Sequence, residues 1–357
     1  MTLILLLWLL VGQPSRLIVG SDTNYRSQPG DTLFTVARRQ GLGLEHLAWA
    51  NQRPVDLKPL PARDYVLPLR RILPKPVADG LVLNLPERAI YHFRGGEFQG
   101  FYPVAIGMPG WNTPVGQFHI ATRATDPTWF PPAWAGVAGP VGPGPDNPLG
   151  DRWMGLSLGG YGIHATNRPD SIGGAVSHGC IRMYPEMARQ LYAQVSPGCP
   201  VRIEYEPVKA GWDGQAFEGV LCVFPDVYGR CDLKAEARRA LADVGLLPWV
   251  DEPLLGRLLA HPSGRAEWVA GEQLRWKETS FPAARRQGRL YCTTQLLEAL
   301  SLQWEEDGER IRVFDDASEL WLTPVPLGGR AMLPLAQTLQ HFGRSFQAQQ
   351  GRLELIP

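Results

Sequence analysis

Frequent glycines and prolines are the feature that most restricts the fold of this chain. The 357 residues include 39 glycines and 33 prolines, which interrupt helices and strands and mark turns. This composition favours β-rich, loop-rich modules over helical bundles. A hydrophobic content of 44% fits globular domains, and the length predicts two or three of them. We therefore expect a mainly β protein with smaller α+β modules.

The charges of the chain balance. Lysine plus arginine number 35, and so do aspartate plus glutamate, which gives a formal net charge of zero. Nucleic-acid binding needs an excess of positive charge, so no nucleic-acid partner is expected.

The first residues form an apolar segment. Residues 3–11 are uninterrupted hydrophobic positions, too few to span a bilayer as a helix but typical of the apolar part of a secretory signal. A basic start and a clean cleavage site are missing. We predict a signal peptide or a retained anchor over residues 1–20. Export to the periplasm or cell envelope follows, with membrane contact only through this segment.

One short string carries the chemistry. Residues 177–183 read Ser-His-Gly-Cys-Ile-Arg-Met, and His164 lies sixteen residues before Cys180. A thiol needs a neighbouring base to become a good nucleophile at neutral pH, and imidazole is the usual partner. Gly179 allows a sharp turn that exposes its own N–H and that of Cys180, which could hold the oxyanion of an acyl intermediate. The pattern predicts acyl transfer by Cys180.

Two other interpretations of these residues remain open. Cys180 could be a buried structural cysteine beside two hydrogen-bonded histidines. His164, His178 and Cys180 could also bind a metal, but no fourth ligand follows at a recognisable spacing. We expect neither a metal nor a cofactor.

The whole string resembles the signature of the L,D-transpeptidase catalytic domain of the YkuD type. The upstream run of residues 164–167, His-Ala-Thr-Asn, and the phrase of residues 113–118 belong to the same resemblance. Ala165 stands where the family usually has glycine, so its methyl group could narrow the site. The resemblance implies a β-sandwich-like catalytic domain, which we assign to residues 79–206.

The resemblance also implies a reaction on peptidoglycan stem peptides. Cys180 would attack the carbonyl before the terminal D-residue of a tetrapeptide, forming a thioester that an amine resolves. The acceptor would be another stem peptide or a wall-attached protein. Water in its place would make an L,D-carboxypeptidase or endopeptidase. A non-catalytic wall-binding protein is the alternative from another class.

The remaining roles follow from the same resemblance. His164 is assigned as the base, with its other ring nitrogen oriented by the carbonyl of Ala165. His178 is the second candidate base, and shaping the site or a structural hydrogen bond are its other interpretations. Arg182 suits a substrate carboxylate through its planar fork, or a structural ion pair. The other motif residues are assigned to substrate binding and its hydrogen bonds: Ser177, Ala165, Thr166 and Asn167.

A small module precedes this domain. Residues 24–70 alternate as strand, helix, helix and strand, with turn residues at 28–31 and Gly41 ending the first helix. The phrases at residues 28–33, 37–39 and 50–51 resemble a LysM module, and a generic helical subdomain is the alternative. The resemblance implies glycan binding through Asp31, Thr32, Leu33 and Asn51. Residues 71–78, with two prolines, are predicted to be a linker.

Residues 126–150 form a long insertion rich in proline, glycine and tryptophan. A loop of this length in a compact domain is usually functional or disordered. Its aromatic residues favour a lid or a substrate wall.

The rest of the chain is predicted to be accessory. Residues 207–262 form a connecting subdomain with a strand at 219–224 and a helix at 233–244. Residues 263–357 hold two copies of a helix–strand pattern about 41 residues apart, with Trp304 and Phe346 at matching places. This α+β region resembles the N-terminal-type domain associated with copper amine oxidases, but no copper-ligand set is present. We expect a structural or wall-contacting role.

Four cysteines remain besides Cys180, and they allow three disulfide connectivities. A bond between Cys222 and Cys231 is the first candidate because they are close in sequence. The alternative is that all four, with Cys199 and Cys292, are reduced.

Overall fold

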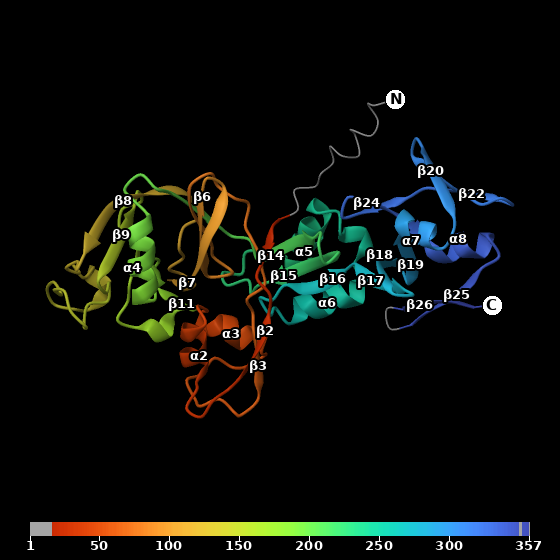
Figure 1. Cartoon of the computed structure of the whole chain (residues 1–357). Coiled ribbons are helices and arrows are strands. Elements are labelled where there is room, and N and C mark those ends of the chain that lie inside the picture. The colour runs from red at the N-terminus through yellow and green to blue at the C-terminus, as the bar shows by residue number, and fades with distance from the viewer. Residues whose placement is uncertain (1–15, 350–351, 357) are drawn as a thin grey trace.

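The computed structural model describes residues 16–349 and 352–356. Four units follow one another along the chain (Figure 1): the N-terminal module (residues 23–67), the nine-stranded unit (80–204), the middle unit (208–270) and the repeat unit (272–356). The apolar run at residues 3–11 lies outside the described residues. Within the described part, none of the helices has the length and apolar character needed to cross a bilayer.

The nine-stranded unit closes on itself. Its sheet has the order β11-β7-β12-β10-β9-β8-β13-β5-β6, and the long strand β7 pairs with β6 as well as with β12 and β11. A strand shared by both ends folds the sheet around one core, which includes Leu81, Ile120 and Ile181. The strands are β5 (Gly80–Asn84), β6 (Ala89–Arg94), β7 (Glu97–Gly107), β8 (Gly116–Thr125), β9 (Arg152–Leu156), β10 (Gly162–His164), β11 (Ala175–Ser177), β12 (Ile181–Met183) and β13 (Pro200–Glu204).

One helix covers this core. Helix α4 (Pro185–Gln194) begins with a proline at its first turn, where the missing N–H costs no hydrogen bond. It places Ala188 and Leu191 in the core.

The N-terminal module has the predicted order of elements. Strand β2 (Thr23–Arg26) pairs antiparallel with β3 (Asp64–Leu67), and helices α2 (Leu33–Arg39) and α3 (Leu44–Ala50) lie between them in sequence. Thr32 caps α2 by accepting a hydrogen bond from the Thr35 N–H at 3.1 Å. The structure thus has the order strand, helix, helix and strand in this module.

The module is docked on the nine-stranded unit. Arg38 pairs through two hydrogen bonds of 2.8 and 2.9 Å with Glu186 at the start of α4. The Leu44 N–H donates to the Ile172 carbonyl at 2.8 Å. A Cβ on Gly43 would lie 2.6 Å from the Cα of Gly173, so the two backbones touch. The module and the sheet therefore share an interface.

The predicted linker is wrong. Residues 71–78 begin with strand β4 (Arg71–Ile72), which pairs with β1 (Ile18–Val19). Ile72 and Leu73 are buried. Residues 16–20, which the sequence assigned to the signal, therefore include a strand of the folded body.

The middle unit extends past the predicted boundary at residue 262. Strands β14 (Val208–Asp213), β15 (Glu218–Val223) and β16 (Glu267–Ala270) form one sheet, with α5 (Leu233–Asp243), η3 (Leu247–Trp249) and α6 (Glu252–Ala260) between the last two. Helix α5 matches its prediction, and Asp232 caps it by accepting from two backbone N–H groups.

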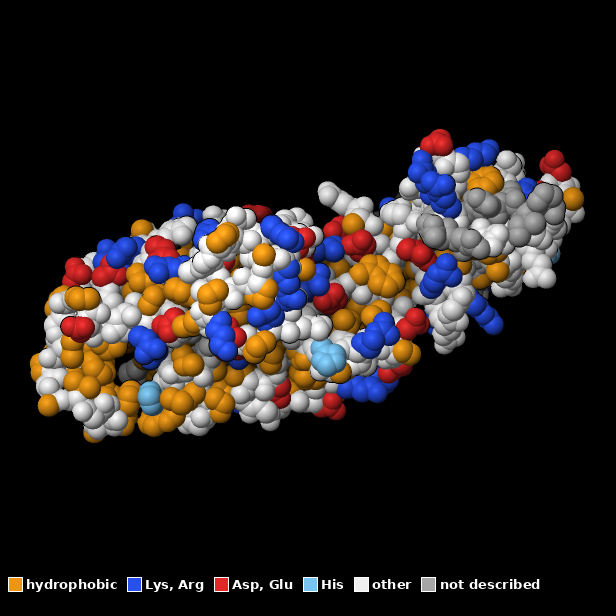
Figure 2. Space-filling view, turned by 90° about the horizontal axis from the view of Figure 1, so that it is seen from below, with side chains coloured by type: hydrophobic (Ala, Val, Ile, Leu, Met, Phe, Trp, Pro, Cys, Tyr) orange, Lys and Arg blue, Asp and Glu red, His pale blue; other side chains and the backbone are white. Residues whose placement is uncertain are grey.

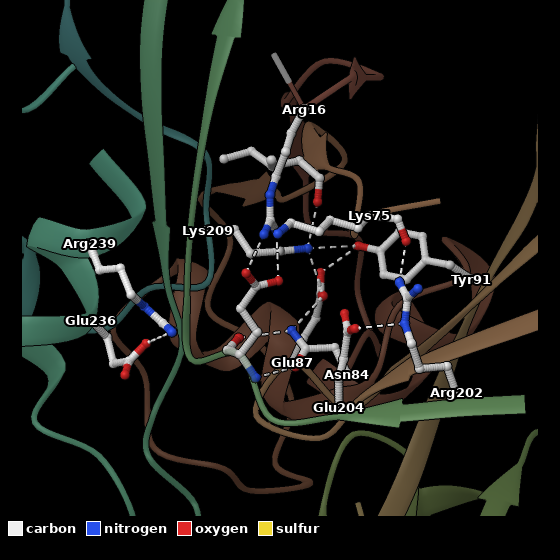
Figure 3. A network of polar contacts seen from close by, with 12 residues as sticks. Arg16, Lys75, Asn84, Glu87, Tyr91, Arg202, Glu204, Lys209, Glu236 and Arg239 are labelled. Atoms are coloured by element: carbon white, nitrogen blue, oxygen red, sulfur yellow. Dashed lines mark hydrogen bonds and ion pairs between the residues drawn. The ribbon is translucent and has the colours of Figure 1, made fainter. Parts of the chain in front are cut away.

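A buried ion pair joins the middle unit to the nine-stranded unit. Lys209 on β14 has no exposed side-chain surface, and its ammonium group donates to Glu87 at 2.8 Å and to the Ile72 carbonyl at 2.5 Å. Tyr91 donates to the other Glu87 oxygen at 2.6 Å. Figure 3 shows Lys209 reaching between these two side chains. The network links β14, β4 and the β5–β6 turn.

The repeat unit contains one order of elements twice. Each copy has a strand, a helix and a two-stranded hairpin: β19, α7, β20 and β21, then β24, α8, β25 and β26. The element bounds are β17 (Glu272–Trp276), β18 (Thr279–Arg286), β19 (Arg289–Thr293), α7 (Thr294–Ala299), β20 (Gln303–Asp307), β21 (Arg310–Phe314), β22 (Glu319–Leu322), β23 (Val325–Leu327), β24 (Arg330–Pro334), α8 (Leu335–His341), β25 (Ser345–Gln349) and β26 (Arg352–Ile356).

All five cysteines are free thiols in the structure. Cys222 lies on β15 and is buried with Ile72 and Phe224, so it faces a core, whereas Cys231 lies in the loop before α5. The candidate bond between Cys222 and Cys231 is therefore wrong.

Candidate active site

Two neighbouring strands bring the sequence motifs together. Strands β10 and β12 pair in parallel, with Ile163 opposite Ile181 and His164 opposite Arg182. Cys180 comes directly before β12. Side chains two residues apart share a face of a sheet, so Cys180, Arg182 and His164 lie on the same face. The isoleucines point the other way, into the core.

The turn before Cys180 requires glycine. Gly179 has φ of +110°, and a Cβ there would meet the ring of Tyr161 at 2.6 Å. The Thr113 hydroxyl donates to the Gly179 carbonyl at 2.9 Å, and the Ser177 hydroxyl donates to the Cys180 carbonyl at 2.6 Å. Hydrogen bonds on both sides thus hold the cysteine at a fixed place.

The predicted pair of oxyanion donors needs a correction. The Gly179 N–H donates to the Ser177 hydroxyl at 3.1 Å and is already used. The Cys180 N–H has no hydrogen bond within the described part of the chain. It is the donor that remains available for an oxyanion.

His164 is held as a neutral imidazole. Its Nδ1 lies 2.5 Å from the carbonyl oxygen of Ala165, so Nδ1 carries the proton and donates it there. Burial lowers the pKa of His164 to about 4. Trp153 stacks on the ring with centroids 5.7 Å apart. The lone pair on Nε2 is therefore available for a proton at neutral pH.

The thiol is also neutral at rest. Burial raises the pKa of Cys180 above its ordinary value, and the Sγ atom lies 3.5 Å from the Gly160 carbonyl, to which it donates. Because both the thiol and the imidazole are neutral, the proton must leave the thiol as the new bond to sulfur forms.

The sequence suggested that the methyl group of Ala165 could narrow the site, but in the structure it does not. Ala165 is buried in the core, and its Cβ lies beside Gly150, where an added Cβ would be only 2.6 Å away. Gly150 ends the long insertion. The extra methyl is thus accommodated by a glycine on the neighbouring loop.

The insertion forms an aromatic wall beside His178. Trp134, in the short helix η1 (Ala133–Ala135), stacks on the His178 ring, and Trp111 approaches the same ring edge-on. Asn147 orders the loop by donating to the Pro127 carbonyl at 2.7 Å. Figure 2 shows apolar side chains gathered around a hollow at this end of the molecule.

The side chains of Asn167 and Arg182 differ in whether they have hydrogen-bond partners within the protein. Asn167 donates to the Asp146 carbonyl at 3.1 Å and so ties the insertion to its motif, while the Thr166 hydroxyl accepts from the Arg168 N–H. Arg182 is half-buried, burial lowers the pKa of its guanidinium, and among the described residues its side chain has no hydrogen bond or ion pair. Its guanidinium is available to a substrate anion.

The four residues assigned to glycan binding hold the N-terminal module together. Asp31 is 4% exposed and accepts from Tyr25, Arg39 and the Gln28 N–H, and Leu33 is fully buried. Thr32 caps α2. The Asn51 side chain donates to the Val66 carbonyl and accepts from the Val66 N–H. Asp31, Thr32, Leu33 and Asn51 therefore have internal partners, which corrects their assignment as a glycan-binding surface.

The sequence did not predict a set of hydrogen bonds that supports the cysteine loop from behind. Tyr228, from the middle unit, accepts from the Thr113 N–H at 3.2 Å and donates to the Gly107 carbonyl at 2.8 Å. Thr113 in turn bonds Gly179. Thr113 begins the motif of residues 113–118, but no sequence pattern near Tyr228 indicated that it would contact the site. In the described residues, no group of histidine, cysteine and acidic side chains could hold a metal ion.

Comparison with known proteins gives the same assignment for this domain. The family model for the L,D-transpeptidase catalytic domain, YkuD, matches residues 78–203. The Escherichia coli K12 protein named "Probable L,D-transpeptidase YcfS" is 31% identical over 216 residues, 57% of this chain and 68% of the relative. "Probable L,D-transpeptidase YbiS" of the same organism is 34% identical over 207 residues, 54% of this chain and 67% of the relative.

A solved structure gives a weaker match. L,D-transpeptidase 3 from Mycobacterium tuberculosis is 19% identical with a TM-score of 0.31, and the match covers 36% of this chain and 61% of that one. The sequence relatives are the stronger finding, because the match spans about two thirds of their length. The chain therefore belongs to the L,D-transpeptidase family, with a YkuD-type catalytic domain at residues 78–203.

Proposed function

We propose that this chain is a peptidoglycan L,D-transpeptidase with Cys180 as the nucleophile and His164 as the base. The observation that carries the proposal is the pairing of β10 with β12, which puts the thiol, the neutral imidazole and Arg182 on one face. The Nδ1 hydrogen bond of His164 to Ala165 replaces the carboxylate of a catalytic triad by a backbone carbonyl.

The reaction then proceeds in two transfers. The Cys180 proton moves to Nε2 of His164 as sulfur attacks the carbonyl carbon before the terminal D-residue, and the Cys180 N–H stabilises the oxyanion. The C–N bond breaks, and His164 returns the proton to the leaving amine. An acceptor amine attacks the thioester and gives a proton to His164, and the sulfur–carbon bond breaks to restore the thiol.

Arg182 is proposed to bind the carboxylate of the donor peptide. Its guanidinium has no anionic partner in the described part of the chain and lies on the same sheet face as Cys180. The rings of Trp111, Trp134 and His178, which contact one another, would form the wall of the peptide groove.

The test uses purified muropeptides with and without an acceptor amine, and mass spectrometry of the products. A transpeptidase gives cross-linked product, whereas release of tripeptide alone would identify a carboxypeptidase. The Cys180→Ala variant should lose all turnover and all covalent labelling by a carbapenem, because Ser177, the other residue of the motif with a nucleophilic group, donates its hydroxyl to the backbone carbonyl of residue 180. Substantial turnover by that variant would exclude Cys180 as the nucleophile and leave the wall-binding alternative.

We propose further that the chain is exported to the periplasm or cell envelope and that the accessory units contact the wall. The βααβ order of the N-terminal module supports a LysM-type glycan-binding role. The duplicated repeat unit is proposed to be the copper amine oxidase-like accessory domain. Sedimentation of full-length Cys180→Ala protein with insoluble peptidoglycan, with and without soluble chitin oligosaccharide, tests the glycan part.

A further inference from the structure

The two copies in the repeat unit are related by a local two-fold axis. Strands β19 and β24 pair antiparallel, with Cys292 opposite Leu333. These residues occupy the same place in the two copies, so the axis passes between them. On either side of this central pair, Tyr291 lies opposite Pro334 and Thr293 lies opposite Met332. The two-fold rotation exchanges these two pairs. Each copy's helix therefore lies beside the arginine that begins the other copy's strand.

Around α7, the helix of the first copy, contacts within the chain occupy these positions. Arg330, at the start of β24, donates to the amide oxygen of Gln295 on α7 at 3.3 Å. The indole N–H of Trp304 donates to Glu298 at 2.6 Å. The arginine, the helix amide, the carboxylate and the aromatic ring are thus paired among themselves.

Around α8, the helix of the second copy, the matching positions line an open groove of about 470 Å³. The residue that matches Arg330 is Arg289, 41 residues earlier. Along the helix and hairpin the offset is 42 residues, so the residues that match Gln295, Glu298 and Trp304 are Gln337, Gln340 and Phe346. Phe346 has no N–H to offer, and Gln340 has no charge where the first copy has Glu298. Within the described residues, Arg289, Gln337 and Gln340 have no side-chain hydrogen bond or ion pair.

The groove also has a positive charge, and the residues that line it include no acidic side chain to balance it. Arg285, another lining residue, pairs with Glu272 at 3.2 Å, but no carboxylate is among the residues that line the groove. An arginine fork recognises a carboxylate through two parallel hydrogen bonds, and glutamine amides match peptide groups. Its volume is within the range of ligand sites.

We propose that this groove is a second binding site for a carboxylate-bearing peptide, the stem peptide of peptidoglycan. The choice of stem peptide rests on the proposed function, whereas the chemistry of the groove does not. Arg289 binds the carboxylate, Gln337 and Gln340 bond the peptide groups, and Phe346 packs on the apolar side. The repeat unit lies at the far end of the molecule from the catalytic domain (Figure 1), so the site holds the wall without acting on it.

The test measures binding of a soluble disaccharide-tetrapeptide to full-length Cys180→Ala protein by calorimetry. We expect two sites per chain, one of which Arg289→Gln weakens about tenfold, as expected for loss of a hydrogen bond to a charged group. Gln340→Glu, which restores the acid of the first copy, should weaken the same site. The matched variant Arg330→Gln should leave both sites unchanged, and thermal unfolding checks that each variant is folded.

Three further ligands show which part of the disaccharide-tetrapeptide the groove recognises. They are the free tetrapeptide, the disaccharide alone, and a tetrapeptide with amidated carboxyl groups. We expect binding of the first and none of the others at this site. A single site per chain, unchanged binding by Arg289→Gln, an equal effect of Arg330→Gln, or binding of the disaccharide here would overturn the proposal. Failure of the proposed function would instead appear as no turnover of the disaccharide-tetrapeptide by the unmutated chain.

Discussion

The imidazole of His178 lies against the indole of Trp134, with ring centroids 3.9 Å apart and planes inclined by 21°. Trp111 meets the same imidazole edge-on at 4.8 Å. Trp134 belongs to the insertion and His178 to the cysteine motif, so their stacked rings join these two segments. Trp111 comes from a different loop. His178 is held by ring contacts, whereas His164 is oriented by a hydrogen bond to a carbonyl. This difference favours His178 as a positioning residue and His164 as the base.

The stack predicts that Trp134 and His178 act as one unit. Trp134→Ala and His178→Ala should each slow carbapenem acylation by about fivefold, because an aromatic contact is worth on the order of 1 kcal/mol. The double variant should be no slower than either single one, since both remove the same contact. Phe130→Ala is the control, because Phe130 lies on the same insertion and is 75% exposed. Additive losses would show that the two residues act separately.

His164 should set the acidic limb of the acylation rate. Its pKa of about 4 lies below the ordinary histidine value of 6.5, so the imidazole stays neutral and competent down to about that pH. A profile measured with a carbapenem should therefore keep its rate below pH 6.5. His164→Ala should lower the neutral-pH rate about 10²–10⁴-fold, the usual contribution of a positioned base.

The alkaline side distinguishes the two histidines. Without His164 the thiol must ionise alone, and burial raises the pKa of Cys180 above its ordinary 9.0, so some rate should return only at strongly alkaline pH. His178→Ala should lower the plateau and leave both limbs in place. Alkaline rescue of the His178 variant instead would reverse the two assignments.

Local patterns predicted the parts of this fold that depend on neighbours in sequence. The βααβ module follows from helical spacing and the cap at Thr32, and the duplication from two matching strand–helix runs. The Cys180 turn was also predicted, because Gly179 alone fits φ of +110° against Tyr161.

Contacts between distant segments were not predictable in this way. The hydrogen bond of the Gly179 N–H to Ser177 depends on how the turn closes, and Tyr228 reaches Thr113 from 115 residues away. The prolines of residues 71–78 suggested a linker, but Ile72 fills a core built by later strands. Such packing depends on surfaces that periodicity does not reveal.

Acid should weaken the docking of the N-terminal module through His46. The neutral ring donates from Nε2 to the Glu87 carbonyl at 2.6 Å and accepts at Nδ1 from the Gly43 N–H at 3.2 Å. Burial, with Arg71 and Arg88 nearby, lowers the pKa of His46 to about 3. The unfolded chain takes up this proton near pH 6.5 and the folded chain does not, so stability is complete above pH 6.5 and falls as pH decreases toward 3.

The measurement is urea unfolding at about pH 7 and about pH 5. Each such histidine contributes a loss approaching about 1.4 kcal/mol per pH unit in that window, and His164 adds to the slope. His46→Gln should be less stable at neutral pH but should show a smaller loss on acidification, because glutamine does not titrate. A variant with the full pH slope of the unmutated chain would show that His46 is not the source.

The last prediction concerns the buried pair of Lys209 and Glu87, which joins the middle unit to the catalytic domain. Lys209→Met should lower the free energy of unfolding by about 3–5 kcal/mol, because it leaves the Glu87 carboxylate buried without a counter-charge. Adding Glu87→Gln should recover much of this loss, since replacing both charges of a buried pair is often close to neutral. Tyr91 can still donate to the new amide, because burial keeps the pKa of its hydroxyl well above 10. Arg238→Ala, which breaks the exposed pair with Glu252, should cost less than about 1 kcal/mol in the same denaturant assay. If the double variant were as unstable as Lys209→Met alone, the loss would come from packing around the methylene chain of Lys209 and not from the unpaired charge.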